Sequence, residues 1–430
     1  MENISTVVKN SLCTGCGTCV GVCPSNAISM RIDDGRGLFL PKIDEKKCSC
    51  CNICVKCCPG YSINMEKLNL KIFGKQPKDS LLGNYLNSYI GHSNDFRLQS
   101  EASSGGMVTQ LLIFALEKGV IDGALVSRMK KDNPLQPEPF IARTREEIIS
   151  ASKSKYCPVP MNVVLRELAV ENGKFAVVGL PCHMHGLRMA EARISSLQGK
   201  IALRIGLLCS HTVNFRGTAF LLNKFRVNAT NVSLIQYRGH GWPGSMLIQL
   251  KNGHALKKQF VRGWNAYWNV FSSFFFTPIR CIMCPDQSCE FSDISMGDAW
   301  LPEVIHNGIG ESVIITRSKE SERLLHLLES CNAITLKNIS PSKVHESQAF
   351  SLDFKKNKIG GRLSLLKIFG MNIPTITPAP RSKSSNCIHA LLPYLSICMS
   401  SNKHFENIMR HIPLPIFRLY LGLFICSSLM

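Results

Sequence analysis

Eight cysteines near the start of the chain form two copies of one pattern, C-x2-C-x2-C-x3-C followed by proline. Four thiolates at this spacing are typical of 4Fe–4S ligands, and in two-cluster ferredoxins the fourth cysteine of each run binds the other cluster. The pattern therefore predicts two clusters with crossed ligand sets: Cys13, Cys16, Cys19 and Cys58 for the first, and Cys48, Cys51, Cys54 and Cys23 for the second.

Disulfide bonding and zinc binding fit these cysteines less well. Disulfides need an oxidising compartment, and the first residues show no secretory signal pattern. Zinc sites use paired ligands that are separated by longer gaps. Because the chain contains 20 cysteines, we expect a reducing compartment, the cytoplasm. Cys50 and Cys57 lie within the second run but off its register, so we interpret them as bystanders.

A chain of 430 residues is too long for a ferredoxin alone. Between the two cysteine runs, apolar residues that alternate from Ile28 and a turn at Asp34-Gly35 predict a hairpin, so the first unit is expected to be self-contained. We divide the chain into four parts: a two-cluster ferredoxin domain at 1–66, a linker at 67–90, a larger domain at 91–345 and a basic, partly helical tail at 346–430.

The formal net charge of +20 invites a nucleic-acid interpretation. However, the basic residues are dispersed, and neither zinc-finger spacing nor an aromatic RNA-binding signature occurs, so we expect no nucleic-acid partner. A basic surface suits an anionic cofactor, an acidic partner protein or a membrane surface equally well. The last stretch, Pro413–Met430, is apolar but contains Pro415 and Arg418, which favours a packed or interfacial helix over a membrane anchor.

Strands alternate with helices from about residue 90 to residue 335. We expect strands at Ile121–Ser127, Phe175–Leu180, Ile201–Leu208 and Ser312–Thr316, and helices at Gly106–Lys118, His185–Ala192 and Glu320–Glu329. This alternation predicts an α+β protein whose larger domain is an α/β unit with a mixed sheet.

The segment Ser103-Ser104-Gly105-Gly106 opens the first of these helices. Small residues at a helix N-terminus expose backbone N–H groups and the positive end of the helix dipole, which together form a natural seat for a phosphate. An ordinary helix cap explains the same residues, so the segment alone does not decide between the two.

A literal G-x-G-x-x-G occurs at Gly239, Gly241 and Gly244. A strand pattern rather than a helix follows it, so we interpret it as a shaped loop and not as a dinucleotide fingerprint. In that loop, Arg238 and Trp242 would face a planar cofactor.

Four more cysteines lie beside strand ends or turns: Cys182, Cys209, Cys281 and Cys284. They would bind a third cluster or a zinc ion if those ends converge, whereas free cysteines are often simply small buried hydrophobes. Cys289 is a fifth candidate nearby. The remaining cysteines show no ligand pattern: Cys157, Cys331, Cys387, Cys398 and Cys426.

Polar residues near these cysteines admit two interpretations. Asp293 and Asp298 lie in a short expected strand that ends in a turn. Asp298 would orient a ribose or a ring nitrogen, or else cap the turn. His183 and His185 flank the turn at Cys182, and we interpret both as ordinary polar residues of a loop.

Together these segments resemble the beta subunits of coenzyme F-420 hydrogenase/dehydrogenase. Six motifs in the expected order carry the resemblance, over about residues 85–345: Ser103-Ser-Gly-Gly, Gly179-Leu-Pro-Cys, Gly206-Leu-Leu-Cys, Arg238-Gly-His-Gly-Trp-Pro, Cys281-x-x-Cys-Pro-Asp and Gly297-Asp-Ala-Trp. Several members of that family also carry a two-cluster ferredoxin unit at the N-terminus. His183, where many members have glutamine, and Cys289 depart from the family pattern.

The resemblance implies an FAD-binding domain with a cluster close to the flavin. By position, Ser103, Ser104, Gly105 and Gly106 would lie against the flavin, and Lys155 and Tyr156 would line the same pocket. The resemblance also favours a third 4Fe–4S cluster bound by the four further cysteines.

We therefore expect an iron–sulfur flavoprotein oxidoreductase that joins a two-electron partner at FAD to one-electron carriers. The two-electron partner would be reduced coenzyme F-420, a deazaflavin, or an organic substrate, and the one-electron partner a ferredoxin or a larger redox complex. Two alternatives remain: a ferredoxin-dependent reductase unrelated to coenzyme F-420, and a non-catalytic electron-transfer subunit of a larger complex. The sequence identifies no general acid or base.

Overall fold

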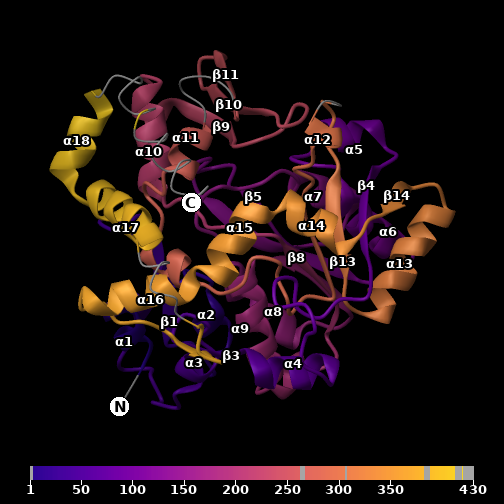
Figure 1. Cartoon of the computed structure of the whole chain (residues 1–430), viewed down its shortest axis with the longest axis horizontal. Coiled ribbons are helices and arrows are strands. Elements are labelled where there is room, and N and C mark those ends of the chain that lie inside the picture. The colour runs from indigo at the N-terminus through magenta and orange to yellow at the C-terminus, as the bar shows by residue number, and fades with distance from the viewer. Residues whose placement is uncertain (1–2, 262–266, 306–307, 382–387, 412–418, 420–430) are drawn as a thin grey trace.

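An eight-stranded mixed sheet forms the centre of the molecule, in the order β14-β4-β13-β12-β8-β7-β5-β6. The computed structural model describes residues 3–261, 267–305, 308–381, 388–411 and 419 (Figure 1). Strands β5, β7, β8 and β12 run parallel, and the outer pairs are antiparallel. The strands are β4 (Ser88–Ser93), β5 (Gly123–Met129), β6 (Pro137–Ala142), β7 (Phe175–Gly179), β8 (Ile201–Leu207), β12 (Ile294–Asp298), β13 (Ser312–Thr316) and β14 (Ile334–Asn338).

The middle strands are apolar on both faces because helices cover both sides of the sheet. Every residue of β7 and of β13 is buried, which is typical of strands in the interior of an α/β domain. Alternate side chains enter different cores: Ile314 faces one layer of helices, whereas Val313 and Ile315 face the other. The predicted mixed sheet and all four predicted strands are therefore confirmed, with shifts of one or two residues at their ends.

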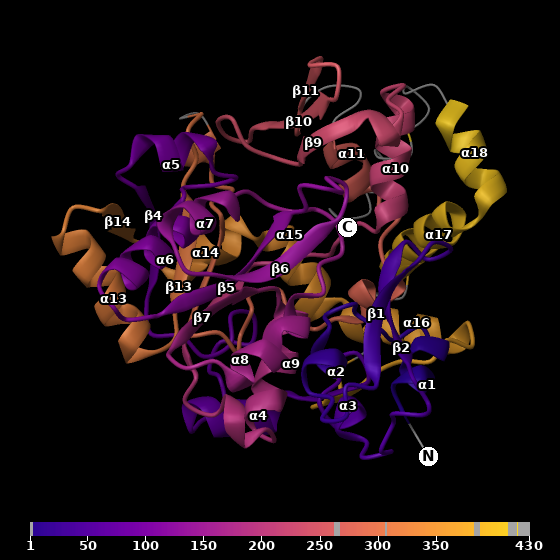
Figure 2. The same ribbon diagram turned by 180° about the vertical axis from the view of Figure 1, so that it is seen from behind.

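Two layers of helices sandwich this sheet (Figures 1 and 2). One layer packs against the core that contains Ile314, and its members are α5 (Phe96–Glu101), α6 (Met107–Glu117), α7 (Arg145–Ser150) and α13 (Lys319–Ser330). The opposite layer consists of η1 (Met161–Val164), α8 (Leu165–Val170), α9 (Pro181–Glu191), η2 (Ser195–Leu197), α12 (Pro302–Ile305), α14 (Pro341–Ser347) and α15 (Ala349–Leu352).

A smaller, aromatic-rich unit adjoins the sheet at one end (Figure 1). Its antiparallel sheet has the order β11-β10-β9, and it packs with two helices around a core that includes Tyr237, Phe260 and Tyr267. The elements are α10 (Phe215–Lys224), η3 (Ala229–Asn231), β9 (Val232–Gln236), β10 (Ser245–Leu250), β11 (Ala255–Gln259), α11 (Tyr267–Ser272) and η4 (Ile279–Met283).

The N-terminal unit contains the predicted hairpin. Strands β1 (Ile28–Asp33) and β2 (Leu38–Ile43) pair antiparallel across the turn at Asp34-Gly35. Helix α1 (Ile4–Lys9) precedes the first cysteine run, and the short helices α2 (Thr18–Gly21) and α3 (Ile53–Lys56) each lie within one run. The stretch 67–90, expected to be a linker, instead continues helix α4 (Met65–Phe73) and ends in β4. Helix α4 crosses the expected boundary at residue 66, and β4 crosses the one at residue 90. The division of the chain into four domains therefore remains a proposal.

The N-terminal unit is not self-contained, in contrast to our expectation. Strand β3 (Ser62–Asn64) pairs in parallel with β15 (Thr375–Thr377) from the far end of the chain. Apolar residues of the cysteine runs share one core with the π-helical turn η5 (Asp353–Asn357) and with α16 (Ile359–Ile368). Figures 1 and 2 both show α16 lying against the N-terminal elements. The C-terminal segment is therefore an integral part of the fold.

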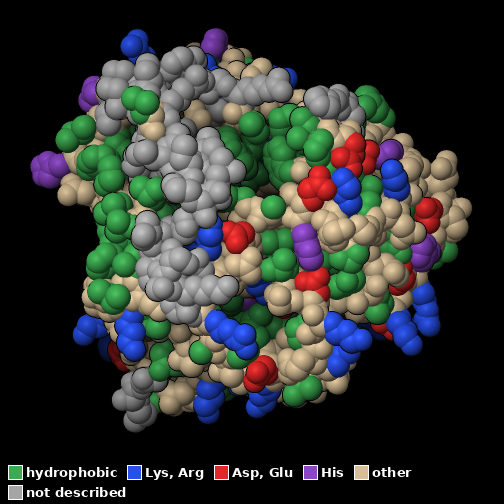
Figure 3. Space-filling view, in the orientation of Figure 1, with side chains coloured by type: hydrophobic (Ala, Val, Ile, Leu, Met, Phe, Trp, Pro, Cys, Tyr) green, Lys and Arg blue, Asp and Glu red, His purple; other side chains and the backbone are tan. Residues whose placement is uncertain are grey.

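Of the last described helices, α17 (Ile388–Ser401) packs against α16 and η4, and α18 (Lys403–His411) packs against α10. Several of their apolar side chains are exposed, among them Leu391, Leu395 and Ile408. Figure 3 shows apolar side chains gathered along the edge that these helices form. In the part of the chain that the structure describes, no helix is both long and apolar enough to cross a bilayer. The stretch Pro413–Met430, on which our expectation of a packed or interfacial helix falls, lies outside the described residues except for Leu419.

Leu366→Ala tests whether α16 supports the N-terminal unit. Leu366 is buried in the shared core, so we expect the free energy of unfolding to fall by about 2–4 kcal/mol, as is usual for such truncations. Chemical denaturation followed by cluster absorbance measures this effect. The exposed Lys367 of the same helix provides the control, Lys367→Ala; equal effects of the two substitutions would contradict the shared core.

Candidate functional site

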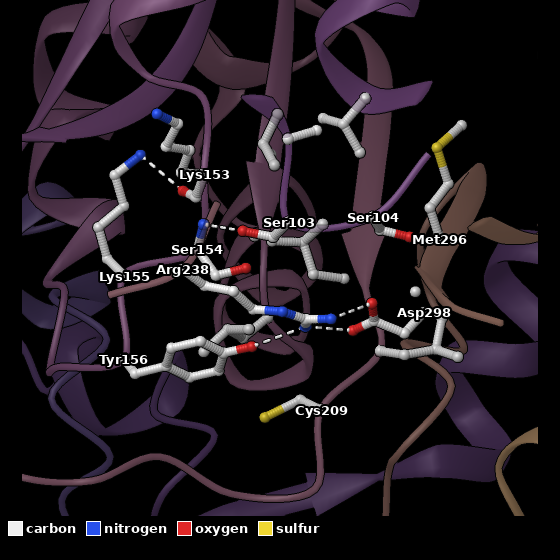
Figure 4. Close-up of a pocket in the computed structure, with 18 of the residues that line it drawn as sticks. Ser103, Ser104, Lys153, Ser154, Lys155, Tyr156, Cys209, Arg238, Met296 and Asp298 are labelled. Carbon is white, nitrogen blue, oxygen red and sulfur yellow. Dashed lines mark hydrogen bonds and ion pairs between the residues drawn. The ribbon is translucent and has the colours of Figure 1, made fainter. Parts of the chain in front are cut away.

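A cavity of about 340 Å³ opens at the carboxyl ends of the parallel strands β5, β7, β8 and β12 (Figure 4). Open α/β sheets bind their ligands at this edge. The predicted residues Ser103, Ser104, Gly106, Lys155 and Tyr156 all line the cavity. The sheet edge therefore brings together segments that lie far apart in the sequence.

The loop before α6 presents backbone N–H groups to this cavity. Gly106 adopts a left-handed conformation (φ 74°), and α6 begins there without a side-chain cap. Met107, Val108 and Thr109 of its first turn line the cavity. Uncapped N–H groups and the positive end of the helix dipole together form a seat for an anionic group.

Hydrogen bonds fix the rest of this loop. Ser103 Oγ accepts a hydrogen bond from Ser154 N–H at 2.9 Å, and Ser104 Oγ donates to the Glu311 carbonyl at 2.9 Å. Gly105 does not line the cavity but packs against the sheet, where a Cβ would lie 2.6 Å from the Gly91 carbonyl oxygen. Gly105 is therefore required for packing, and the other three residues form the cavity wall.

Lys155 stabilises the loop on the opposite side of the cavity. Its ammonium group donates to the carbonyls of Ala151, Ser152 and Lys153, which uses all three of its donors. Burial lowers the pKa of Lys155 to about 7. In this arrangement Lys155 holds the loop in shape, and its ammonium hydrogen bonds are directed to the backbone.

A buried ion pair crosses the cavity wall (Figure 4). The Arg238 guanidinium donates to both carboxylate oxygens of Asp298, at 2.7 and 2.8 Å, and to the Tyr156 hydroxyl at 3.2 Å. Trp242 Nε1 donates to the same carboxylate at 2.8 Å. Asp298 therefore anchors Arg238, and Trp242 lies behind the wall rather than facing the cavity as we expected.

Aromatic rings complete the wall, and of these only Trp300 had been singled out from the sequence, as part of a motif. Trp268, Phe271, Trp300 and His211 line the cavity. The His211 ring stacks between Phe271 and Phe274, with centroid distances of 4.0 and 4.4 Å, and burial lowers its pKa to about 3. The run Phe274-Phe275-Phe276 is the sequence signal that could have indicated this aromatic wall. Its contact with His211 could not be predicted, because the two segments are far apart in the sequence.

The four further cysteines converge beside this cavity. Cys209 follows β8 and lines the cavity, whereas Cys182 lies in the first turn of α9. Burial raises the pKa of Cys182, and the neighbouring thiols of Cys16, Cys209, Cys284 and Cys281 raise it further. The four thiols therefore lie within electrostatic range of one another, together with one thiol of the first cysteine run.

Three buried cations surround these thiols: Arg280, Lys355 and Arg362. Among the described residues, no carboxylate forms an ion pair with any of them, and Arg280 Nη1 and Arg362 Nη2 are buried without a hydrogen-bond partner. Isolated buried charges are costly. An anionic group between these cations fits the site, and a 4Fe–4S cluster bound by four thiolates carries a net negative charge.

Two neighbouring predictions need correction. His183 and His185 lie in helix α9 and are buried, not in a polar loop. His183 Nδ1 accepts the Leu180 N–H at 3.1 Å, and its Nε2 is 3.0 Å from the Val159 carbonyl; burial lowers its pKa to about 4. His185 pairs with buried Asp286 at 2.8 Å.

Cys289, the fifth candidate, is fully buried behind this site. Its thiol is directed to the Gly179 carbonyl at 3.8 Å, and burial raises its pKa. Asp293 forms ion pairs with Arg188 and Arg204, which tie α9 to β8. Neither residue faces the cavity.

In the N-terminal unit, the thiols of the two runs intermingle. Burial raises the pKa of Cys19, as do the nearby thiols of Cys13, Cys16 and Cys58. Burial also raises the pKa of Cys54, with a further contribution from Cys23. Each run thus approaches the last cysteine of the other run. Within the described ranges, no three Cys, His, Asp or Glu side chains are placed to share one metal ion; the thiolates of a 4Fe–4S cluster bind different irons and lie farther apart.

Two buried polar side chains join the N-terminal unit to the large domain. Arg280, next to Cys281, donates to the carbonyls of Gly60 and Pro59 at 3.0 and 2.8 Å. The Asn162 side chain donates to Thr18 Oγ1 and to the His183 carbonyl, both at 2.9 Å. These contacts place the first cysteine run beside Cys182.

The chain matches three family models. Residues 88–166 match the model for the N-terminal part of the beta subunits of coenzyme F-420 hydrogenase/dehydrogenase, and residues 172–342 match the model for the C-terminal part of the same subunits. Residues 6–29 match the model of a 4Fe–4S binding domain. The two beta-subunit models together cover more than half of the chain.

Several curated proteins are similar to this chain. The beta subunit of the coenzyme F-420 hydrogenase of Methanothermobacter thermautotrophicus is 28% identical over 57% of this chain and 82% of its own length. A subunit of the F-420H2 dehydrogenase of Methanosarcina mazei is 26% identical over 72% of this chain and 84% of its own length. The coenzyme F-420-dependent sulfite reductase of Methanocaldococcus jannaschii is 26% identical over 83% of this chain, which spans 52% of that protein.

A chain of the F-420-reducing [NiFe] hydrogenase complex from Methanosarcina barkeri shares the fold. Its TM-score is 0.54 at 22% identity, and the match covers 70% of this chain and 98% of that chain. Sequence motifs, fold and family models therefore agree: the chain belongs to the family of coenzyme F-420 hydrogenase/dehydrogenase beta subunits, whose members are iron–sulfur redox proteins.

Proposed function

We propose that this protein is an iron–sulfur flavoprotein oxidoreductase with FAD in the cavity and three 4Fe–4S clusters. The observation that carries the proposal is the position of Cys209, which lines the cavity and also belongs to the group of four converging thiols. A cofactor in the cavity would then lie beside a cluster bound by Cys182, Cys209, Cys281 and Cys284. The eight cysteines of the two runs would hold the other clusters, in the crossed sets given above.

The cavity supplies what a flavin dinucleotide needs. The uncapped first turn of α6 offers N–H donors and a positive dipole end to a pyrophosphate. Ser103 and Ser104 shape this seat, and Lys155 holds the facing loop. Trp268, Trp300 and the Arg238 guanidinium provide flat surfaces for ring systems.

A bound flavin supplies the chemistry that exchanges a two-electron hydride for single electrons. The cavity residues would orient the cofactor, and Cys209 brings the neighbouring group of thiols to the cavity wall. We assign no catalytic proton donor or acceptor among the cavity residues.

Coenzyme F-420 is the two-electron partner that the relatives favour. The hydrogenase, the dehydrogenase and the sulfite reductase all carry this coenzyme in their names. An organic substrate remains the alternative partner. To distinguish the two partners, reduced coenzyme F-420 is added to the purified protein and its oxidation is monitored by the absorbance of the coenzyme.

The one-electron partner would meet the second cysteine run. Cys16, Cys19 and Cys58 are buried, whereas Cys51 is exposed and Cys48 is partly exposed. The first run adjoins the cavity-side thiols through Cys16 and Cys182. This order gives a path from the cavity through the third and first clusters to a surface where a ferredoxin or a larger redox complex could dock.

Two relatives are named as subunits, which favours a second function for this chain as an electron-transfer subunit of a larger complex. In that case the isolated chain would bind its cofactors and accept electrons from a partner, but it would show no turnover with reduced coenzyme F-420 alone.

Cys209→Ala tests the third cluster. Anaerobically purified wild-type protein should contain one FAD and about twelve irons per chain, and the variant about eight. Iron and sulfide analysis measures both values. Cys289→Ala, which removes a buried thiol from the same neighbourhood, should retain about twelve. Loss of four irons from both variants, or from neither, would contradict the assignment of Cys209.

Arg238→Met tests the ion pair in the cavity wall. Removal of the cation leaves Asp298 without its main partner, so we expect a loss of about 3 kcal/mol in stability and reduced flavin content. Denaturant unfolding and the fluorescence of released flavin measure these effects.

The double variant Arg238→Met/Asp298→Asn should lose less stability than the sum of its single variants, because the orphaned carboxylate is gone. Arg128→Met removes a partly exposed ion pair with Glu138 and should cost less than about 1 kcal/mol. If Arg238→Met behaved like Arg128→Met, the anchoring role of Asp298 would be wrong.

A further inference from the structure

We propose that the C-terminal segment 353–362 supplies two buried cations, Lys355 and Arg362, that raise the reduction potential of the third cluster. The segment lies beyond residue 342, where the beta-subunit match ends. The inference rests on the proposed third cluster and assigns a role to a part of the chain that we had described only as a basic tail.

Lys355 reaches the cluster site from the π-helical turn η5. Its side chain is buried, and its ammonium donates to the Cys281 carbonyl at 2.7 Å. The positive charge of Lys355 lowers the pKa of Cys209 and that of Cys281, although burial raises both pKa values. Lys355 therefore acts electrostatically on two of the four proposed ligands, while its hydrogen bond fixes the Cys281 backbone.

Arg362 approaches the same loop from helix α16. Its Nε donates to the Ile282 carbonyl at 2.9 Å, and its guanidinium lies 3.6 Å from the centroid of the Phe354 ring. Nη2 is buried without a hydrogen-bond partner. Burial lowers the pKa of Arg362 to about 9, while the nearby groups Asp353 and Cys284 raise it, so the side chain is charged at neutral pH.

Arg280 provides the third cation, and no described carboxylate forms an ion pair with any of the three. One buried carboxylate, Asp286, also acts on the site: it pairs with His185 and, in addition to burial, raises the pKa of Cys209. Four thiolates and a 4Fe–4S core carry about two negative charges when oxidised and about three when reduced. Added positive charge in a medium of low dielectric favours the more negative, reduced form. The cations therefore make this cluster a better electron acceptor.

This placement suits a cluster that lies beside the cavity. A cofactor that delivers single electrons needs a neighbouring acceptor with a sufficiently high potential. The N-terminal unit and the segment 353–362 share one hydrophobic core. The same segment therefore packs against the N-terminal unit and places two positive charges beside the proposed cluster.

Redox titration of the full-length protein, monitored by electron paramagnetic resonance, tests this inference. The signal of the third cluster is identified as the one that Cys209→Ala abolishes. In Lys355→Met and in Arg362→Met we expect the reduction equilibrium of this cluster to fall at least about tenfold, which corresponds to about 59 mV for a one-electron couple. Lys367→Met, on the exposed side of α16, should leave the potential unchanged.

Charge-retaining variants separate electrostatics from packing. Lys355→Arg and Arg362→Lys should retain the cluster and stay close to the wild-type potential. If a methionine variant loses the cluster but its charge-retaining partner keeps it, the electrostatic role is supported. Shifts in the charge-retaining variants as large as those in the methionine variants would overturn it, as would unchanged potentials in the methionine variants. A wild-type protein with about eight irons would instead refute the proposed third cluster itself.

Discussion

Buried charge is the constraint on which the arrangement of this molecule depends. Arg280, Lys355 and Arg362 lie in the interior, at the point where the N-terminal unit, the large domain and the C-terminal segment meet, and no carboxylate in the described part of the chain forms an ion pair with them. Isolated cations in such a place would destabilise the fold by several kcal/mol each. Thiolates that bind a cluster offset this cost, so cofactor binding and the association of the three parts are expected to be coupled.

The parallel strands explain why most of the site could be predicted from the sequence. Strands β7, β8 and β12 end at one edge of the sheet, and Cys182, Cys209 and Asp298 follow or end those strands. Buried β-branched runs and the cysteine spacing are local signals that predict strands and ligand residues. Because ligands bind at the carboxyl ends of parallel strands, these signals together predict where the site lies. The residues thus identified line the cavity or adjoin it.

What the sequence could not reveal depends on contacts between distant segments. Lys355 and Arg362 are two basic residues among many in a basic tail, and only the packing of α16 against η4 distinguishes them. Likewise, β3 pairs with β15 across some three quarters of the chain, and no local pattern in a three-residue strand indicates its partner. His183 and His185 were misassigned because the helix begins at Pro181, earlier than the apolar periodicity suggested.

The junction between the N-terminal unit and the large domain also bears on the proposed path of the electrons. Asn162 and Arg280 hold the first cysteine run against Cys182 by buried hydrogen bonds, and a Cβ at Gly186 would overlap Thr18 Oγ1. Such a dry, closely packed contact suits electron transfer, which needs proximity but no solvent. His183 and His211, which line the cavity beside this junction, are buried, and burial lowers their pKa values to about 4 and about 3, so both rings are neutral near pH 7. The proposed two-electron reaction at the cavity would thus be separated in space from the proposed one-electron exchange at the exposed second run.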